Sequence, residues 1–399
     1  MKVFQLNTFY GKGSTGRIAQ GIHDRCLQEG IECVTAYRFP EDHQVFPDTW
    51  YTTTWLEGHV HNRLAWWTGL QGCFSLFHTA RLIGRIKSYR PDVIHLHNLH
   101  GSYLNQPLLF RYLKKAGVPV IWTLHDCLTM TGRCPHFLHS GCDRWKTGCH
   151  DCPQIHEFPS AVVDLTRWMW KWKKQWYTGV PVMTLCPPSR WLAGVISKSY
   201  LKEYPVRVLP NGIDRGVFKP TLGSWREGLG LEKGTKLVLF VASPWSDLKG
   251  LQEVFRFARE LGEKCRVVMV GAEKGMELPE QVIGVPRTND PALLAEIYTC
   301  ADVFVSASRE ENYPTVHMEA LSCGTPVVTY DVGGCAEIID STCGLAVPCG
   351  EEEKLLSAVR EVLENRPFSR ESCLKRAESF DREERFGEYI RLYRELAGK

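Results

Sequence analysis

Two glutamates in the second half of the chain have a spacing that suits one shared ligand. Glu311 lies in a polar stretch and Glu319 in the helical pattern that follows, with seven residues between them. At a rise of about 1.5 Å per residue, their carboxylates lie up to about 12 Å apart. That separation suits hydroxyl groups at two ends of an elongated ligand, because the carboxylates of a hydrolytic acid/base pair are normally closer. Two solvated glutamates are the simpler alternative, and spacing alone does not exclude it.

The segment around this pair predicts a strand, a loop, a helix and a second strand. Residues 302–306 form the first strand, Pro314 stands at the helix start, and Gly324-Thr325-Pro326 ends the helix before the strand at 327–330. A loop at the carboxyl end of a parallel strand is where open α/β sheets bind ligands, and the N–H groups of a helix start favour an anion. We therefore expect an anionic ligand at this loop.

Strand and helix patterns alternate along the whole chain and predict an α/β fold with parallel sheets. We expect strands at residues 2–7, 31–37, 92–97, 118–124, 182–186, 236–242, 266–270, 302–306 and 327–330. We expect helices at residues 15–29, 79–89, 104–116, 190–199, 251–261, 292–298, 315–323, 351–363 and 380–396. Pro210 and Asn211-Gly212 break both patterns, so we place the domains at 1–208 and 209–379, followed by a terminal helix at 380–399.

Composition narrows the classes of protein and partner. A chain of 399 residues with 44% hydrophobic residues is too long for one core. Its net charge of +3 gives no general attraction to nucleic acid, so we expect no nucleic-acid partner. No apolar stretch reaches the roughly 18 residues of a membrane span and no export signal is evident, which predicts a cytoplasmic protein whose 16 cysteines are mostly reduced.

Several strings together resemble the family 4 retaining glycosyltransferases. They are ENYPTVHMEALSCGTPVV at 311–328, VGGCAEII at 332–339, NGID at 211–214, FKP at 218–220 and DLKG at 247–250. In the first half, WTLHD at 122–126, MTGRC at 130–134 and WKTGC at 145–149 are similar to the bacterial colanic acid and exopolysaccharide branch. The resemblance implies the GT-B architecture, in which two Rossmann-like domains face each other across a cleft and the last helix crosses back to the first domain.

The resemblance also implies roles for residues of the second domain. The donor would be a UDP- or GDP-sugar, with Glu311 positioning sugar hydroxyls, Glu319 holding the ribose and Lys249 facing the diphosphate without a catalytic metal. The surrounding motif adds Asn312, Tyr313, Pro314 and Thr315 to the expected donor contacts. Ser243 stands near the place where the family usually has an arginine, so backbone N–H groups, the helix start or Arg309 could hold the diphosphate instead.

In the first domain, the resemblance points to the glycine-rich loop and to one strand end. Gly13 and Gly16 follow the first strand and precede a helix, a setting in which phosphate can approach backbone amides. His125 would bind a donor sugar hydroxyl, and Asp126 would contact the acceptor. His95 and His97 alternate on one strand, and two histidines without a third ligand favour a structural role over a metal site.

The resemblance implies an enzyme that transfers a hexose with retention of its anomeric configuration. The expected acceptor is a saccharide, lipid-linked, of a growing cell-surface polysaccharide. No residue clearly fits a nucleophile, so we expect front-face substitution with Glu311, His125 and Lys249 in catalytic positions. A GT-B epimerase or hydrolase and a noncatalytic saccharide-binding protein are the alternatives.

A cysteine cluster falls in an insertion expected near residues 127–160. Four cysteines lie within nineteen residues, the last two as Cys-x-x-Cys: Cys134, Cys142, Cys149 and Cys152. Four thiolates suit tetrahedral zinc with no open position for catalysis, so we expect a structural zinc site. Free cysteines or a redox pair are the alternatives.

A tryptophan-rich segment lies between Asp164 and Tyr177. At about 100° per residue, one stripe carries aromatic and apolar side chains and the opposite one carries cations. The stripes are Leu165, Trp168, Met169, Trp172 and Trp176 against Arg167, Lys171 and Lys174. This pattern suits the inner surface of a membrane, whereas a core-packed helix with snorkelling lysines is the alternative.

Overall fold

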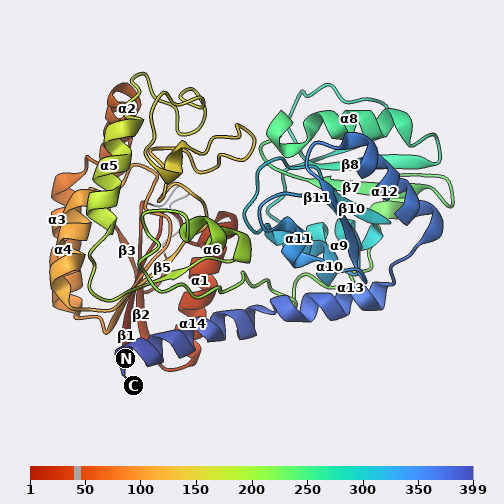
Figure 1. The fold of residues 1–399 in the computed structure, drawn as a ribbon. Helices are drawn as coiled ribbons and strands as arrows, with labels where there is room; N and C mark the ends of the chain where they lie inside the picture. The colour runs from red at the N-terminus through yellow and green to blue at the C-terminus, as the bar shows by residue number, and fades with distance from the viewer. Residues whose placement is uncertain (40–45, 399) are drawn as a thin grey trace. The chain divides into compact units, whose positions relative to one another are not determined.

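The computed structural model describes residues 1–39 and 46–398, which form two compact units. The first unit comprises Met1–Pro210 with Glu383–Lys399, and the second comprises Asn211–Arg382. Helices cover the sheet of each unit (Figure 1). The boundaries expected from the sequence, after residues 208 and 379, lie within three residues of these junctions.

The first unit contains a six-stranded parallel sheet in the order β3-β2-β1-β4-β5-β6. Its strands are β1 (Lys2–Leu6), β2 (Glu32–Tyr37), β3 (Thr49–Tyr51), β4 (Val93–Leu96), β5 (Val120–Thr123) and β6 (Met183–Cys186). Its helices are α1 (Gly13–Gln28), α2 (Trp55–Thr68), α3 (Leu76–Tyr89), α4 (Gln106–Ala116), the 3₁₀ turn η1 (Arg144–Lys146), α5 (Thr166–Tyr177), α6 (Arg190–Ile196) and α14 (Arg382–Ala397). The strand order reverses between β1 and β4, which marks the ligand-binding edge of such a sheet.

The second unit repeats this plan with a six-stranded parallel sheet in the order β12-β11-β10-β7-β8-β9. Its strands are β7 (Lys236–Val241), β8 (Cys265–Ala272), β9 (Val282–Pro286), β10 (Val303–Ser306), β11 (Val327–Asp331) and β12 (Gly344–Pro348). Its helices are α7 (Trp225–Gly228), η2 (Asp247–Lys249), α8 (Leu251–Glu260), α9 (Pro291–Cys300), α10 (Thr315–Ser322), α11 (Cys335–Ile338), α12 (Glu352–Asn365), α13 (Arg370–Ala377) and η3 (Glu378–Phe380). Here the order reverses between β7 and β10. The predicted α/β class with two Rossmann-like domains is confirmed.

Both faces of the first sheet are buried, as parallel sheets require. Along β1, Val3 packs in one apolar cluster and its neighbour Phe4 in another, because successive side chains point to opposite faces. The cluster around Val3 includes Phe386, Tyr389 and other residues of α14. The last helix of the chain is therefore part of the core of the first unit.

Helix α14 approaches α1 closely at one glycine. A Cβ atom on Gly21 would lie 2.2 Å from the ring of Phe386, which is only 4% exposed. Helix α14 also reaches the sheet, where the hydroxyl of Tyr393 lies 2.6 Å from Nδ1 of His95 on β4. The contact between α14 and α1 thus depends on the absence of a side chain at residue 21.

Helix α5 packs differently from the pattern expected for it. Its buried face consists of Thr166, Met169, Trp170, Lys173 and Tyr177, and the Lys173 ammonium donates to the carbonyl oxygens of Leu128 and Thr131 at 2.9 and 3.2 Å. Trp168 and Trp172 remain 51% and 37% exposed. The helix is packed against the core, but through Lys173 rather than the tryptophan stripe, and Met169 does not share the exposed side.

Helix α10 buries a histidine without giving it a hydrogen bond. His317 is fully buried, neither ring nitrogen has a partner, and its ring meets Phe304 edge-on at 5.7 Å between centroids. Burial lowers the pKa of His317 to about 4. Since an unfolded histidine titrates near its ordinary pKa of 6.5, the unfolded chain binds a proton that the folded one refuses, and stability falls as pH drops from 6.5 towards 4.

Substitution of Gly21 by alanine is expected to destabilise the first unit by about 1–3 kcal/mol, because Phe386 has no room to move. Gly84 in α3 is the matched control, since a Cβ atom there meets nothing within 4 Å. Gly84→Ala is expected to stabilise by about 0.5–1 kcal/mol through helix propensity. Chemical denaturation of both variants measures the difference, and equal effects would contradict the close packing of α14.

Replacement of His317 by leucine is expected to flatten the pH dependence of stability. Between pH 7 and 5 the wild type should lose about 2 kcal/mol more unfolding free energy than His317→Leu, because only the wild type takes up this proton on unfolding. Denaturant titrations at the two pH values measure the loss. Equal losses in the two proteins would show that His317 is protonated, or solvated, in the folded state.

Candidate functional site

The loops that follow β7 and β10 are tied together at the switch point of the second sheet. The Arg309 N–H donates to the Leu248 carbonyl oxygen at 2.8 Å. Gly250 has a φ of +82°, and a Cβ atom there would lie 2.5 Å from the Cβ atom of Ala307. Because only glycine permits both the conformation and the approach, the chain brings Lys249 to the loop after β10.

Lys249 and Glu311 form an ion pair in this corner. The Lys249 Nζ lies 2.5 Å from Glu311 Oε1. Burial opposes the lysine charge, but the Glu311 carboxylate outweighs it, so the pKa of Lys249 is raised. The ammonium is therefore charged at neutral pH, and it stands at the carboxyl ends of β7 and β10, where an anion would meet it.

The loop from Glu311 to the start of α10 is fixed by its neighbours. Asn211 donates from Nδ2 to the Tyr313 carbonyl oxygen at 3.0 Å, and the Gly334 N–H donates to the Asn312 carbonyl oxygen at 2.7 Å. A Cβ atom on Gly333, whose φ is +58°, would lie 1.9 Å from the Glu311 carbonyl oxygen. Asn312 and Tyr313 are buried, Pro314 precedes the helix, and Thr315 is its first residue.

Glu319 lies about one turn into α10, the helix that follows this loop. It is 7% exposed in α10, and its Oε2 accepts a hydrogen bond from the Tyr298 hydroxyl at 3.2 Å. Tyr298 comes from α9, so two helices orient this carboxylate. The structure thus places Lys249, Glu311 and Glu319 on elements around the carboxyl end of β10.

Arg309 is engaged with carboxylates of the second unit, whereas Ser243 is exposed. The Arg309 guanidinium pairs with Glu253 at 2.7 Å and Glu352 at 3.0 Å, and these carboxylates outweigh burial and raise its pKa. Its charge is thus already matched by two carboxylates, which disfavours the expected phosphate contact. Ser243 is exposed just after β7 and adds no charge.

In the first unit, the loops after β1 and β4 are also tied together. Thr8 donates from its hydroxyl to the Asn98 carbonyl oxygen at 3.1 Å, and the Asn98 N–H donates to Asn7 Oδ1 at 3.2 Å. Asn7 in turn donates from Nδ2 to the Thr15 carbonyl oxygen at 3.2 Å, which anchors the glycine-rich loop. Gly13 begins α1, and Gly16 lies one turn into it.

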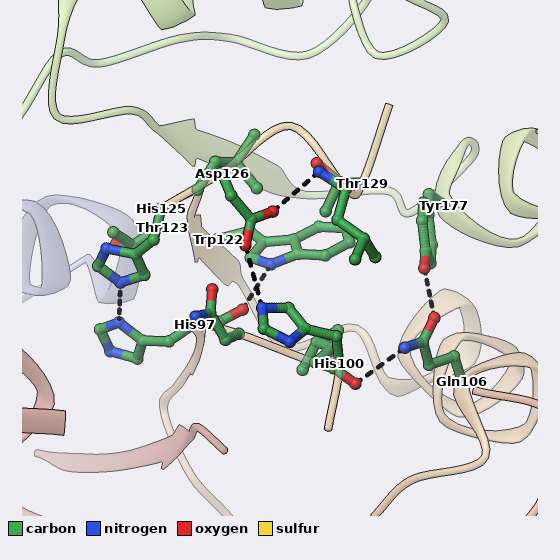
Figure 2. A pocket seen from close by; sticks show the side chains of 13 residues that line it. His97, His100, Gln106, Trp122, Thr123, His125, Asp126, Thr129 and Tyr177 are labelled. Carbon is green, nitrogen blue, oxygen red and sulfur yellow. Dashed lines mark hydrogen bonds and ion pairs between the residues drawn. The ribbon is translucent and has the colours of Figure 1, made fainter. Parts of the chain in front are cut away.

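His125 and Asp126 follow β5 and line a pocket together with His97 and His100 (Figure 2). His100 Nε2 lies 3.0 Å from Asp126 Oδ2, and the Leu128 N–H donates to Asp126 Oδ1 at 2.8 Å. Burial alone would raise the pKa of Asp126, but His100 and this N–H lower it to about 2. Asp126 is therefore a fixed carboxylate in the pocket.

The hydrogen-bond order in the pocket assigns the tautomer of His125. Burial lowers the pKa of His97 well below its ordinary value and that of His125 to about 4, so both rings are neutral. His97 Nε2 donates to Gln5 Oε1 at 3.1 Å, since that oxygen only accepts. His97 Nδ1 must then accept from His125 Nε2 at 3.2 Å. This leaves Nδ1 as the acceptor atom of the His125 ring.

Sequence reasoning gave His97 only a structural role, and it missed His100 of this pocket and Gln5, whose Oε1 lies 3.1 Å from His97 Nε2. His95 is structural as expected, since Tyr393 and Thr123 bind its two nitrogens at 2.6 and 2.8 Å. His97, by contrast, contacts His125 directly. The signal was available in the spacing of His95, His97 and His100, because a residue that ends a strand and one just beyond it face the same sheet edge.

The predicted zinc site at Cys134, Cys142, Cys149 and Cys152 is not formed. Within residues 1–39 and 46–398, no group of three or more metal-ligating side chains is placed to hold a metal ion. Burial raises the pKa of Cys134 to about 12 and that of Cys149 to about 11. Cys149 Sγ instead accepts a hydrogen bond from the Gly132 N–H at 3.1 Å, and all four are free cysteines.

Known proteins resemble this chain along both units. A family model described as "Glycosyltransferase Family 4" matches residues 22–216, and one described as "Glycosyl transferases group 1" matches residues 223–380. The putative colanic acid biosynthesis glycosyl transferase WcaC of Escherichia coli is 26% identical over 382 residues, covering 90% of each chain. The D-inositol 3-phosphate glycosyltransferase of Segniliparus rotundus is 28% identical over 193 residues, covering 43% of this chain and 42% of the relative.

Solved structures share the fold at lower identity. Sucrose-phosphate synthase from Thermosynechococcus elongatus has a TM-score of 0.72 at 17% identity, covering 99% of this chain and 98% of that one. Anabaena HepE in complex with UDP has a TM-score of 0.69 at 15% identity, covering 98% and 99%. Two family models that span both units, with a relative aligned along nine-tenths of the chain, show that this chain belongs to glycosyltransferase family 4 and has its GT-B fold.

Proposed function

We propose that this glycosyltransferase moves a hexose, with retention of its anomeric configuration, from a UDP-sugar to a saccharide acceptor, lipid-linked, during synthesis of a cell-surface polysaccharide at the cytoplasmic side of the membrane. The Lys249–Glu311 ion pair at the carboxyl ends of β7 and β10 is the observation that carries the proposal. It offers one fixed cation to a diphosphate and one carboxylate to sugar hydroxyls. The description of HepE as a complex with UDP supports the choice of uridine over guanosine.

The donor-binding roles follow from the second unit. Lys249 would turn from Glu311 towards the diphosphate, because a dianionic group outcompetes a single carboxylate for the ammonium. Glu311 would then accept hydrogen bonds from hexose hydroxyls. Glu319, oriented by Tyr298, would accept from the ribose hydroxyls, and the N–H groups at the start of α10 would add to the binding of the diphosphate.

The chemical step in this proposal needs no enzyme nucleophile. The acceptor oxygen bonds to the anomeric carbon on the face from which the phosphate oxygen leaves, and that departing oxygen takes the acceptor proton. The Lys249 ammonium stabilises the negative charge that develops on the diphosphate. His125, with Nδ1 as its acceptor atom, would orient a hydroxyl, and the Asp126 carboxylate would bind the saccharide acceptor.

Alanine substitution of Lys249 or Glu319 is expected to weaken UDP binding by about tenfold or more, since each loses a charged hydrogen bond. Lys375→Ala, which removes an exposed lysine on α13, is the matched control and should bind as the wild type does. Thermal shift with UDP, GDP and ADP at several concentrations measures the affinities. Unchanged UDP affinity in both site variants would contradict the donor assignment, and preferential stabilisation by GDP would replace uridine.

Lys249→Ala is also expected to lower sugar transfer by about 10²-fold or more, because it removes the cation that stabilises the leaving group. Product analysis with and without a saccharide acceptor tests the reaction class. Transfer with the anomeric configuration of the donor supports the proposal. Release of free sugar, or an altered nucleotide sugar without acceptor, would instead identify a hydrolase or an epimerase.

A further inference from the structure

Helix α2 carries its apolar side chains on the outside. Its buried residues are Gly58, His61 and Ala65. Its exposed large apolar residues are Trp55, Leu56, Val60, Leu64, Trp66 and Trp67, with exposed fractions from 40% to 66%. A helix on the surface of a soluble domain normally has the reverse arrangement. The outer face of α2 therefore has the composition of a face that meets something other than water.

This face continues onto neighbouring segments. The Val162 N–H donates to the Trp66 carbonyl oxygen at 2.9 Å, and a Cβ atom on Gly69 would lie 2.5 Å from the Val163 carbonyl oxygen. The end of α2 thus lies against the segment that leads into α5, and both helices are seen at the edge of the first unit (Figure 1). The start of α3 is a further neighbour, since Ser75 Oγ lies 2.8 Å from His61 Nδ1 of α2. The exposed apolar residues of these neighbours are Leu76, Phe77, Phe158, Val162, Val163, Trp168 and Trp172.

The concentration of these residues is specific to one region. Thirteen of the seventeen exposed large apolar side chains of the described residues lie in residues 55–77 and 158–172, which we call the α2–α5 face. The second unit contributes one, Leu222. Monomeric proteins rarely expose contiguous apolar patches of this kind unless the patch binds a partner or a membrane.

The charges beside the α2–α5 face are mostly positive. Exposed cations along it are Arg63, Arg81, Arg167, Lys171 and Lys174. The acidic residues within residues 55–81 and 158–177 are Glu57 and Asp164, and both are engaged, Glu57 with His78 and Thr53 and Asp164 with Thr166 and the Cys152 N–H. Lys171 also lies 5.4 Å from the centre of the Trp168 ring. The mixture of aromatic and cationic side chains matches the headgroup region of an anionic bilayer.

A second copy of the chain fits this face less well. Symmetric association places the same patch against itself, so the arginines and lysines of one copy would meet those of the other. In a bilayer, the tryptophans can contact the apolar acyl chains while the cations contact the phosphate groups of the lipids. Within the described residues no helix is both long and apolar enough to cross a membrane, so contact through this face would be at the surface.

We propose that the α2–α5 face docks the first unit on the surface of a membrane that contains anionic lipid. This inference extends the proposed function, since a lipid-linked acceptor lies at such a surface, but its test does not require the transfer reaction. Helix α5 connects the two: its outer side carries Trp168 and Trp172, while Lys173 on its inner side binds the Leu128 carbonyl oxygen, two residues after Asp126. Docking would therefore hold the pocket lined by His125 and Asp126 about one helix diameter, roughly 10 Å, from the lipid headgroups.

Vesicle co-sedimentation of the full chain tests the docking. Wild-type protein is expected to bind vesicles of phosphatidylcholine with phosphatidylglycerol, and to bind pure phosphatidylcholine vesicles less. The double variants Leu56→Ser/Trp67→Ser and Trp168→Ser/Trp172→Ser should each lower the partition coefficient by about tenfold or more, because each removes two large apolar side chains from the bilayer. Leu222→Ser, which removes a leucine of the second unit that is 95% exposed, should leave the partition coefficient unchanged.

Lys171→Glu/Lys174→Glu separates the electrostatic contribution, since it should weaken binding to the anionic vesicles and leave weak binding to phosphatidylcholine as it was. Binding that all of these variants retain, or no binding by the wild type, would overturn the proposal. A wild-type dimer that Leu56→Ser/Trp67→Ser converts to a monomer in sedimentation velocity would also overturn it, by assigning the face to self-association. UDP-induced thermal shifts in the same variants keep this result separate from the donor assignment: loss of UDP binding in every protein would contradict the proposed function and leave the docking intact.

Discussion

The contact between Lys249 and Glu311 depends on the most general feature of the fold. In a parallel sheet, strands that are neighbours in space but distant in sequence end at one edge, and β7 and β10 are such neighbours at the point where the strand order reverses. Sixty-two positions separate the two residues in the chain, yet their side chains meet at 2.5 Å. When no ligand is bound, the Glu311 carboxylate balances the charge of the Lys249 ammonium. The ammonium therefore stays charged and in place for an anion.

In the first unit, the last helix, α14, makes hydrogen bonds to polar side chains of the first sheet. Tyr393 and Tyr389 from α14 reach His95 and Thr123 on β4 and β5. Burial then keeps His95, His97 and His125 neutral, because the hydration that a charged imidazole would lose outweighs even the attraction of Asp126 for His125. The hydrogen bonds from His125 to His97 and from His97 to Gln5 follow from that neutrality, so Gln5 near the start of the chain determines which nitrogen of His125 is the acceptor.

The sequence predicted the central strands, the edge strand β6 and most helices well, and failed at the other three sheet edges. β1, β4, β7 and β10 lie at the centres of their sheets and appear as apolar runs, which a buried polar residue interrupts in β1 (Gln5) and in β4 (His95). The strands that were missed, β3, β9 and β12, all lie at sheet edges. β9 and β12 each contain a glycine and a proline, and β3 has three residues, so none carries a strong strand pattern.

The candidate site divides in the same way. Glu311, Glu319, Lys249 and His125 belong to strings whose residue types are informative by themselves. Glu311, Lys249 and His125 lie in segments that follow strands, and Glu319 lies in α10. His100 and Gln5 were missed because their roles depend on a partner supplied by another strand. Residue type alone was less informative for Arg309 and for the four cysteines. The fold gives Arg309 two carboxylate partners, and within the described residues it does not arrange the cysteines to hold a metal ion.

Helix α2 escaped prediction for a reason that bears on function. Helical patterns are recognised by an apolar stripe that turns towards the core, and α2 has small residues and a histidine there instead. Its apolar residues are spread over the remaining surface, so the sequence has no clear period. The six large apolar side chains of α2 are not packed in the core. Each Å² of apolar surface that they leave in water costs about 25 cal/mol of folding free energy. Folding alone gives no reason for this cost, which is why the proposed docking of the α2–α5 face rests on α2.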